Sequence, residues 1–349
     1  MTRGEIGRNL GYVPYDPHLR RPADRRRFPR YAAMRDLLFD LVSDWDIHDV
    51  IVLSSIADFA KWVDAPSDRG IVLDLPDAFL DERPGMRSRG RGFAKWFGGE
   101  LSRPIARYRR LVERMLERAD AVVCSTDEQA EKIVSYCQNV YPILDLHGEI
   151  ECVPPRLRKS DGLDVVWEGL TSTLPAVQQV LPALRAVARS GEVRVHLVTD
   201  LVAPRYMNRF RPRQTADLVE DWGIDIRLHQ WSVDKLAEVS SISDIAIVPV
   251  DLTDPMAVGK PENRMRVFWR LGLPVVASRS PSNLRAASLA GVEDQVICSS
   301  LEDWRNTLES LSSRPEDRLA IASACQTVAL TTYSEQSLAE RWDQVFESL

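Results

Sequence analysis

Short apolar segments rich in β-branched residues alternate with longer amphipathic segments along nearly the whole chain, and this alternation constrains the fold more than any other feature. The segments that predict strands are 50–54, 71–75, 121–124, 143–146, 165–168, 193–199, 226–229, 245–250, 275–278 and 296–299. Several are continuously apolar, which is typical of strands covered on both faces in a parallel sheet. The segments that predict helices between them are about 31–43, 92–119, 127–138, 175–189, 213–222, 233–241, 261–271 and 283–290. This order predicts βαβ units and a doubly wound α/β architecture.

The alternation is interrupted near residues 153–161, where two prolines, a basic cluster and Asp-Gly give the composition of a linker. A chain of 349 residues is also long for one hydrophobic core. We therefore predict a Rossmann-like domain over 1–155 and a second over 162–332. The last segments, 301–313, 315–331 and 335–348, look helical, with no strand expected after 299. Because ligands bind at the carboxyl ends of strands in such sheets, we expect the site in a cleft between two facing domains.

Composition excludes several classes of protein. The chain is 44% apolar and 28% charged, as soluble globular proteins are. Its apolar runs are far shorter than the roughly 20 residues of a membrane span, and its N-terminus does not resemble a secretory signal, so we expect a cytoplasmic protein. The five cysteines and five histidines are scattered, so we expect reduced thiols and no metal site.

Charge is distributed unevenly along the chain. Residues 1–118 contain 22 Lys and Arg against 18 Asp and Glu, whereas the remaining residues contain 23 against 33. The basic excess lies in Arg20–Arg30 and in 83–118, and it predicts either an ordinary solvated surface or contact with something anionic. Nucleic acid is not expected, because the isoelectric point is near 5.6 and no aromatic residues are interleaved with a basic motif.

The segment 254–278, DPMAVGKPENRMRVFWRLGLPVVAS, contains the strongest candidate site. Gly259 and Pro261 mark a helix start, since proline favours the first turn. Met265, Phe268, Trp269 and Gly272 follow at helical spacing and predict its buried face. The residues of the first turn outside that face are Lys260, Asn263 and Arg264. Backbone N–H groups beside Lys and Arg predict an anion site suited to phosphate, although the same residues also suit a solvated helix start.

This segment resembles the signature near the end of GT-B glycosyltransferases, especially of families 4 and 1, in which a phosphate-binding helix precedes a Gly-x-Pro-Val-Val-Ala-Ser strand. Residues 118–126 (RADAVVCST) and 244–250 (DIAIVPV) resemble strands of the two domains of that fold. The segment 333–349 is similar to the helix that packs back on the N-terminal domain. The resemblance implies transfer of a sugar from a nucleotide-diphosphate sugar, bound by the C-terminal domain, to an acceptor on the N-terminal side.

One departure concerns the glutamate pair of many family 4 enzymes. Its two positions correspond here to Gly259 and Val267, so both acids are absent. Asp254 and Glu262 have the same separation but lie earlier relative to the strand. The resemblance to family 4 implies retention of the anomeric configuration, and Glu262 stays a donor-binding candidate.

Two further segments are donor-binding candidates by the same resemblance. Glu168 and Gly169 follow a strand, where the family places a glycine-containing loop close to the diphosphate; the glycine lets backbone approach closely. Trp231 and Ser232 follow another strand, where the family places the nucleobase. Stacking of Trp231 on a base and its burial as an ordinary apolar side chain are both compatible with the sequence.

Acceptor-side candidates come from the first half. Asp74 and Asp77 lie at the end of a strand, and similar enzymes present an acidic motif or a histidine there. Asp77 suits orientation of an acceptor hydroxyl or stabilisation of developing positive charge, but also a helix cap. His147 precedes the linker and resembles a cleft-lining segment. The predicted catalytic set is Asp77, Lys260 and Arg264, without metal or cofactor.

We therefore expect a metal-independent, retaining glycosyltransferase of the hexosyltransferase type, acting on a glycan, lipid or small molecule. The alternatives are a non-catalytic module that binds a sugar nucleotide or a partner, and a nucleotide-sugar epimerase. The motifs of serine hydrolases and dinucleotide enzymes, G-x-S-x-G and G-x-G-x-x-G, do not follow the expected strands. Phe93, Trp96, Phe97 and Leu101 form an apolar stripe beside Arg89, Arg91 and Lys95. Such a stripe most often belongs to the core, and its alternative is peripheral contact with an anionic membrane.

Overall fold

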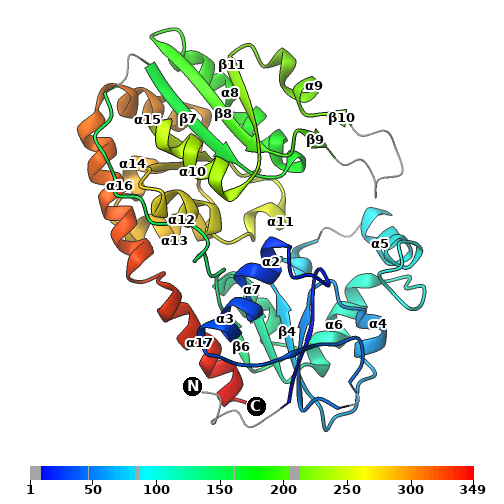
Figure 1. Cartoon of the computed structure of the whole chain (residues 1–349). Coiled ribbons are helices and arrows are strands. Elements are labelled where there is room, and N and C mark those ends of the chain that lie inside the picture. The colour runs from blue at the N-terminus through cyan, green and yellow to red at the C-terminus, as the bar shows by residue number, and fades with distance from the viewer. Residues whose placement is uncertain (1–8, 46, 83–85, 160–161, 204–212) are drawn as a thin grey trace. The chain divides into compact units, whose positions relative to one another are not determined.

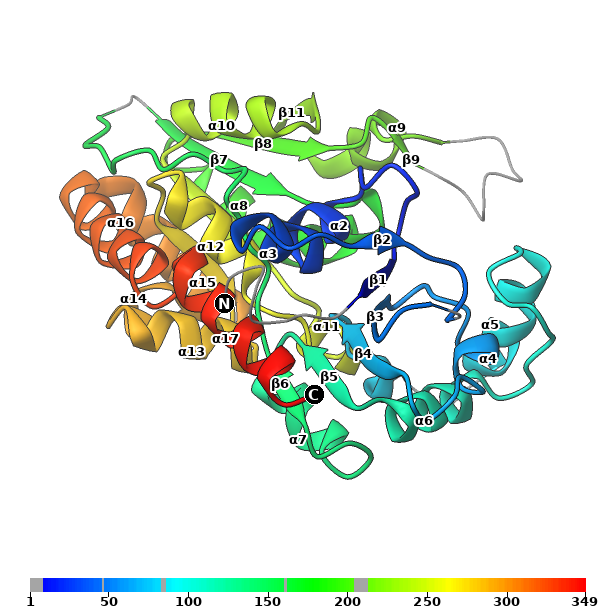
Figure 2. The same cartoon turned by 60° about the horizontal axis from the view of Figure 1, so that its bottom comes forward.

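The computed structural model describes residues 9–45, 47–82, 86–159, 162–203 and 213–349, with backbone alone for 86–91. The chain divides into two compact units. The first contains Met1–Gly148, Gly259–Pro261 and Glu335–Leu349, and the second contains Glu149–Val258 and Glu262–Ser334. Each unit is a parallel sheet flanked by helices (Figures 1 and 2).

The sheet of the first unit is entirely parallel, in the order β2-β1-β3-β4-β5-β6. The strands are β1 (Leu10–Val13), β2 (Asp40–Leu41), β3 (Val50–Ser54), β4 (Gly70–Leu75), β5 (Ala121–Cys124) and β6 (Val140–Pro142). Every residue of β3 and β5 is buried, which explains why these strands are apolar without alternation. The sheet reverses its strand order between β1 and β3, the kind of switch point where α/β proteins bind ligands.

In the described part of the first unit, eight helical segments connect or cover these strands. They are α2 (Pro22–Arg26), α3 (Phe28–Met34), α4 (Phe59–Trp62), the 3-10 turn η1 (Phe79–Asp81), α5 (Met86–Phe97), α6 (Tyr108–Arg118), α7 (Asp127–Ile133) and α17 (Glu335–Glu347). The last helix, α17, packs on α3: Trp342 stacks on Tyr31 with ring centroids 5.6 Å apart. Arg35 Nη2 pairs with Asp343 at 2.8 Å and Arg30 with Glu335 at 2.9 Å, so both ends of α17 are fixed.

The second unit has strand order β11-β8-β7-β12-β13-β14, again all parallel. Its strands are β7 (Gly162–Glu168), β8 (Glu192–Thr199), β11 (Asp225–Gln230), β12 (Ile245–Val248), β13 (Val275–Ser278) and β14 (Ile297–Cys298); β9 (Val202–Ala203) and β10 (Arg213–Gln214) pair separately. Numbered within the unit, this is the dinucleotide-fold order 3-2-1-4-5-6, with its switch point between β7 and β12.

The helical segments of the second unit are η2 (Thr171–Thr173), α8 (Leu174–Val187), α9 (Ala216–Val219), η3 (Glu220–Trp222), α10 (Val233–Ile242), α11 (Pro255–Val258), α12 (Asn263–Arg270), α13 (Pro281–Leu289), α14 (Glu293–Val296), α15 (Leu301–Ser313) and α16 (Pro315–Leu330). Helix α12 buries Met265, Phe268 and Trp269 completely, which confirms the predicted stripe. In the described part of the chain no strand follows β14, as expected.

Several predictions about elements were wrong. The predicted helix 31–43 ends at Met34, and β2 lies in the rest of that segment. The segment 143–146 is an extended loop, and the edge strand lies just before it at Val140–Pro142. The predicted helix 92–119 is two helices, α5 and α6, separated by residues 98–107, where Gly98, Gly99 and Pro104 interrupt the helical pattern. Strands β1 and β2 were missed, because one is only four residues and the other two. These two strands are recognised by their pairing with neighbouring strands and not by a hydrophobic pattern of their own.

Arg27, counted in the sequence as part of a basic surface, is instead buried in the first unit. Its Nη2 lies 2.7 Å from Asp74 Oδ1, and its Nη1 lies 3.2 Å from Asp145 Oδ1. Arg27 and Asp74 are 1% and 0% exposed. Although burial alone would lower it, the two carboxylates raise the pKa of Arg27, so the guanidinium stays charged. This ion pair joins α2–α3 to the end of β4.

Candidate functional site

Side chains from three elements of the second unit meet at the carboxyl ends of its strands. Glu168 ends β7, Trp231 follows β11, and Arg264 is in the first turn of α12. Trp231 Nε1 donates to Glu168 Oε2 at 3.2 Å, and Arg264 Nε lies 4.0 Å from Glu168 Oε1. The structure thus brings together two of the predicted donor-binding residues, Glu168 and Trp231, and one of the predicted catalytic residues, Arg264. We call Glu168, Trp231 and Arg264 the switch-point cluster.

Local contacts hold Arg264 in this cluster. Its guanidinium lies 5.8 Å from the Trp167 ring centroid, and Nη2 is 3.4 Å from Thr173 Oγ1. Arg264 and Glu168 are 27% and 15% exposed, so both side chains are partly accessible. A carboxylate accepts hydrogen bonds from hydroxyl groups, an indole offers a face for stacking, and a guanidinium neutralises an anion. The cluster therefore has the groups to hold a sugar, a planar base and a phosphate.

Gly169 provides room for this arrangement. Its N–H donates to Val198 O at 3.2 Å, so the amide is already used within the unit. A Cβ at this position would lie 2.7 Å from Trp167 Cζ2 and 2.9 Å from Arg264 Nη2. Gly169 thus allows the Arg264 side chain to approach the backbone closely; it does not supply a free N–H for phosphate.

Replacing Gly169 by alanine is expected to displace the Arg264 side chain, because the new methyl group overlaps it. We expect the dissociation constant of a nucleotide diphosphate to rise about tenfold, in line with the loss of one charge-assisted hydrogen bond. Isothermal calorimetry measures it. Gly191 is the matched control, since a Cβ there meets nothing within 4 Å. Equal affinities for the two alanine variants would contradict this role.

Other predicted donor-side residues lie in structural positions. Ser232 Oγ accepts from Lys235 N at 3.0 Å and caps α10. Asn263 Oδ1 accepts from Arg266 Nη1 at 3.0 Å. Glu262 is 2% exposed, and its Oε1 accepts from Tyr333 Oη at 2.8 Å. Burial raises the pKa of Glu262. In the described structure Glu262 fixes the start of α12 and does not face solvent.

The segment Gly259–Pro261 belongs to the first unit and is tied to it by Gln129, a residue that the sequence analysis missed. Gln129 Nε2 donates to Gly259 O at 3.1 Å and lies 3.3 Å from Pro76 O. Its Oε1 accepts from Ser125 N at 2.8 Å. Lys260 and Asp77, both exposed, directly follow the two bridged carbonyls. Two of the three predicted catalytic residues are therefore held near one another by one buried amide. No local sequence pattern predicts this role of Gln129.

The remaining acceptor-side predictions fall on buried groups. Asp74 is enclosed with Arg27, and His147 is 1% exposed. Neither side chain reaches the surface in the described structure, whereas Asp77, three residues beyond Asp74, is exposed. The two aspartates differ because Asp74 is still within the buried strand β4, whereas Asp77 lies beyond the end of that strand.

A histidine pair absent from the sequence predictions lies on the sheet of the second unit. His196 Nδ1 is 3.1 Å from His229 Nε2, and His196 Nε2 is 3.1 Å from Asp164 Oδ1. Although burial raises it, hydrogen bonds from Arg194 and His196 bring the pKa of Asp164 to about 2. Burial, His196 and Lys235 lower the pKa of His229 below its ordinary 6.5, while Glu238 opposes them.

We expect His229 to make stability depend on pH. Because the pKa of His229 is lower in the folded than in the unfolded state, its contribution is complete above pH 6.5 and is lost as pH falls below that value. We expect the urea midpoint to fall between pH 7.5 and 5.5, and His229→Gln to reduce that fall. His18→Gln, an exposed histidine, is the control. An unchanged pH dependence in His229→Gln would contradict the assignment.

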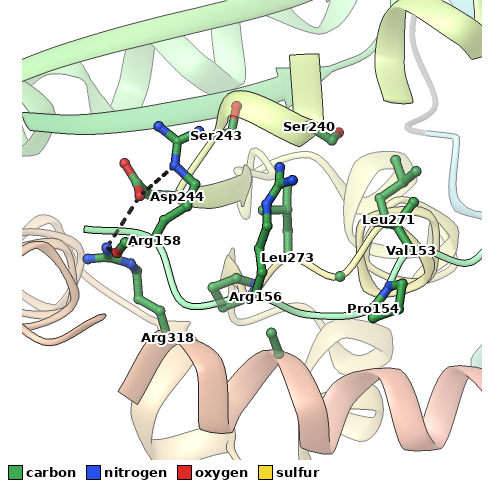
Figure 3. A pocket seen from close by; sticks show the side chains of 13 residues that line it. Val153, Pro154, Arg156, Arg158, Ser240, Ser243, Asp244, Leu271, Leu273 and Arg318 are labelled. Atoms are coloured by element: carbon green, nitrogen blue, oxygen red, sulfur yellow. Dashed lines mark hydrogen bonds and ion pairs between the residues drawn. The ribbon is translucent and has the colours of Figure 1, made fainter. Parts of the chain in front are cut away.

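A small pocket of the second unit lies at the opposite end of the sheet from the switch-point cluster (Figure 3). Arg158 and Arg318 both approach Asp244 there, at 3.5 and 3.3 Å. The cavity volume is about 20 Å³, which suits a single water molecule. The buried Ser240 Oγ, which has no hydrogen-bond partner, would bind such a water. This pocket is too small for a sugar nucleotide.

Among the described residues, no group of three or more His, Cys, Asp or Glu side chains is placed to hold a metal ion. None of the described helices is long and apolar enough to cross a membrane.

Comparison with known proteins identifies the fold. No protein-family model and no curated protein sequence matches the chain. Several solved structures are similar to the chain in fold. The Anabaena protein Alr3699/HepE, in complex with UDP and glucose, has a TM-score of 0.60 at 13% identity over 86% of this chain and 78% of its own. Sucrose-phosphate synthase from Thermosynechococcus elongatus gives 0.58 at 12% identity over 92% and 75%.

TarM is similar with a TM-score of 0.57 at 10% identity over 85% of this chain, which spans only 54% of TarM. These likenesses show that the chain has the GT-B fold, as the sequence predicted.

Proposed function

We propose that this chain, with its GT-B fold and its switch-point cluster, is a glycosyltransferase that moves a sugar from a nucleotide-diphosphate sugar to an acceptor hydroxyl. The observation that carries the proposal is the convergence of Glu168, Trp231 and Arg264 at the carboxyl ends of a 3-2-1-4-5-6 sheet. Several structures of similar fold are of proteins bound to UDP, among them HepE and a pneumococcal O-GlcNAc transferase.

Each residue of the cluster has a role in this proposal. Trp231 stacks on the nucleobase, and Glu168 accepts a hydrogen bond from a donor hydroxyl. Arg264 and Lys260 neutralise the negative charge that builds on the diphosphate as the glycosidic bond breaks. Asp77 orients the acceptor hydroxyl or stabilises the positive charge that develops on the anomeric carbon.

The finer features of the proposal come from the sequence and its resemblance to GT-B glycosyltransferases. No cofactor is required beyond the donor, transfer is retaining, and the transferred group is a hexose. The acceptor is a glycan, lipid or small molecule, and the protein works in the cytoplasm with peripheral contact to an anionic membrane. Arg264 and Lys260, rather than a bound metal ion, neutralise the charge of the diphosphate.

A panel of UDP, GDP, dTDP and CDP sugars in a thermal-shift assay, followed by measurement of nucleotide diphosphate release with candidate acceptors, tests the function. Stabilisation by one sugar nucleotide together with acceptor-dependent release supports the proposal. Stabilisation without release indicates a binding module. Conversion of the donor sugar without an acceptor indicates an epimerase.

Transfer is expected to persist in excess EDTA, because two cationic side chains take the place of a metal beside the diphosphate. We expect a change of less than twofold in the rate of nucleotide diphosphate release after chelation. Adding back Mg²⁺ or Mn²⁺ is the control. Loss of activity in EDTA that either ion restores would contradict metal independence.

A further inference from the structure

The amide of Gln129, a buried side chain of the first unit, meets three backbone groups at once. Gln129 is in the first turn of α7 and is 4% exposed. Its Oε1 accepts from Ser125 N at 2.8 Å, while Nε2 lies 3.1 Å from Gly259 O and 3.3 Å from Pro76 O. One N–H and two carbonyls match the amide in only one orientation, because only its nitrogen can donate twice. The direction of the side chain is therefore fixed by its partners.

The two carbonyls that Gln129 binds belong to short segments outside regular structure. Pro76 directly follows β4, and Gly259 directly follows α11. Pro76 and Pro261 have no N–H, so each segment can form fewer backbone hydrogen bonds of its own. The residues on either side of Gly259–Pro261 are in the second unit, whereas these three are in the first. The hydrogen bond from Gln129 thus helps to hold them there.

Each bridged carbonyl lies one residue before an exposed, charged side chain. Asp77 follows Pro76, and Lys260 follows Gly259. The carbonyl of one residue and the N–H of the next share a planar peptide group, so a fixed oxygen also fixes the plane that leads to the next Cα. Gln129 thereby sets the starting points of both side chains, without a hydrogen bond to either of them in the described structure.

We propose that Gln129 is a positioning residue for the proposed transfer: one buried amide holds the peptide groups that precede Asp77 and Lys260 in a single arrangement before substrates bind. The inference rests on the proposed function for the roles of Asp77 and Lys260. Positioning of this kind matters, because a displacement of about 1 Å that originates far from the reacting atoms can lower a rate roughly 10²-fold. A side chain that only stabilises α7 has no such effect on the rate.

Amide hydrogen exchange of the full chain, without substrates, tests the structural part of the inference. Gln129→Met keeps the length of the side chain but cannot donate. Exchange should become about tenfold faster in the peptides 75–82 and 255–262, in line with the loss of one net hydrogen bond at each. Unchanged exchange in either peptide would overturn the inference. Because this measurement needs no sugar donor, its failure and the failure of the transferase proposal are separate results.

Steady-state release of nucleotide diphosphate tests the kinetic part. We expect Gln129→Met to lower kcat about 10- to 100-fold and to leave KM within about threefold, because the amide orients groups that act on the reacting atoms and does not itself bind the donor. A rise in KM with kcat unchanged would overturn the inference.

Gln129→Glu is a second variant that preserves the start of α7. Its carboxylate has the shape of the amide and can still accept from Ser125 N, but it has no proton to donate to the two carbonyls. Circular dichroism establishes that the variant folds. It should lose kcat as Gln129→Met does, and full kcat in Gln129→Glu would show that the two donated hydrogen bonds do not support the rate.

Thr126→Ala is the matched control for a purely structural role. Thr126 is also buried, and its Oγ1 accepts from Gln129 N at 3.2 Å as the N-cap of α7. Removing this cap weakens the same first turn but leaves both carbonyls with their donor. Thr126→Ala should lower the midpoint of thermal unfolding, with kcat and exchange in 255–262 within about twofold of the unchanged chain. Equal losses of kcat in Thr126→Ala and Gln129→Met would make Gln129 a helix cap only.

Discussion

Alanine at Lys260 or at Arg264 is expected to lower turnover by roughly 10²–10³, the usual cost of removing one group that stabilises developing negative charge. Arg264 is held next to Glu168 and Trp167, so its charge is already oriented before a donor binds. Lys260 follows the carbonyl that Gln129 fixes. In the proposed function both charges act on the leaving diphosphate, so the loss should appear in kcat as well as in kcat/KM.

Steady-state release of nucleotide diphosphate measures this effect. Arg227→Ala and Lys235→Ala are matched controls, since both residues are in the second unit and pair at the surface with Asp225 and Glu238. They should stay within twofold of the unchanged chain. If Lys260→Ala or Arg264→Ala stays equally active, that residue has no part in the transfer.

Replacing Arg27 by methionine is expected to destabilise the protein by about 3–5 kcal/mol, because it leaves the carboxylate of Asp74 buried without its counter-charge. The guanidinium donates to both oxygens of Asp74 and to Ile143 O, and none of these groups has access to water in its place. The free energy of unfolding, from urea denaturation followed by circular dichroism, measures the loss.

The double variant Arg27→Met, Asp74→Leu separates charge from packing. Removing both charges should recover most of the loss, since a buried ion pair contributes little relative to apolar residues of similar volume. Arg227→Ala, which removes an exposed pair, should cost less than about 1 kcal/mol. A double variant no more stable than Arg27→Met would show that packing, not the buried charge, explains the loss.

The elements that could be predicted from the sequence are those with a local pattern. The continuously apolar strands β3, β5, β12 and β13 were located to within two residues, because each residue of such a strand is buried whatever its neighbours are. The buried side of α12 followed from helical spacing, and with it the position of Arg264 on the first turn. The candidates Glu168 and Trp231 followed from the family resemblance together with their places at the ends of strands.

Contacts between residues that are distant in the sequence could not be predicted from the spacing of residues along the chain. Arg27 is 47 residues from Asp74 and 118 from Asp145, so nothing near it in the sequence distinguishes it from the solvated arginines beside it. Gln129 joins two carbonyls 53 and 130 residues away. The aromatic residues of α5 have the spacing of a core stripe, yet the sheet is already covered by α6, and they remain outside.

The sequence by itself therefore determined the α/β class, the order of most strands and the places where site residues follow them, since these depend on which residues avoid water along a short segment. The tertiary structure alone decided which charges are buried in pairs, which apolar stripe stays exposed and which side chains meet at the switch point. Those outcomes depend on partners distant in the chain, and burial of a charge is tolerated only where folding brings its counter-charge.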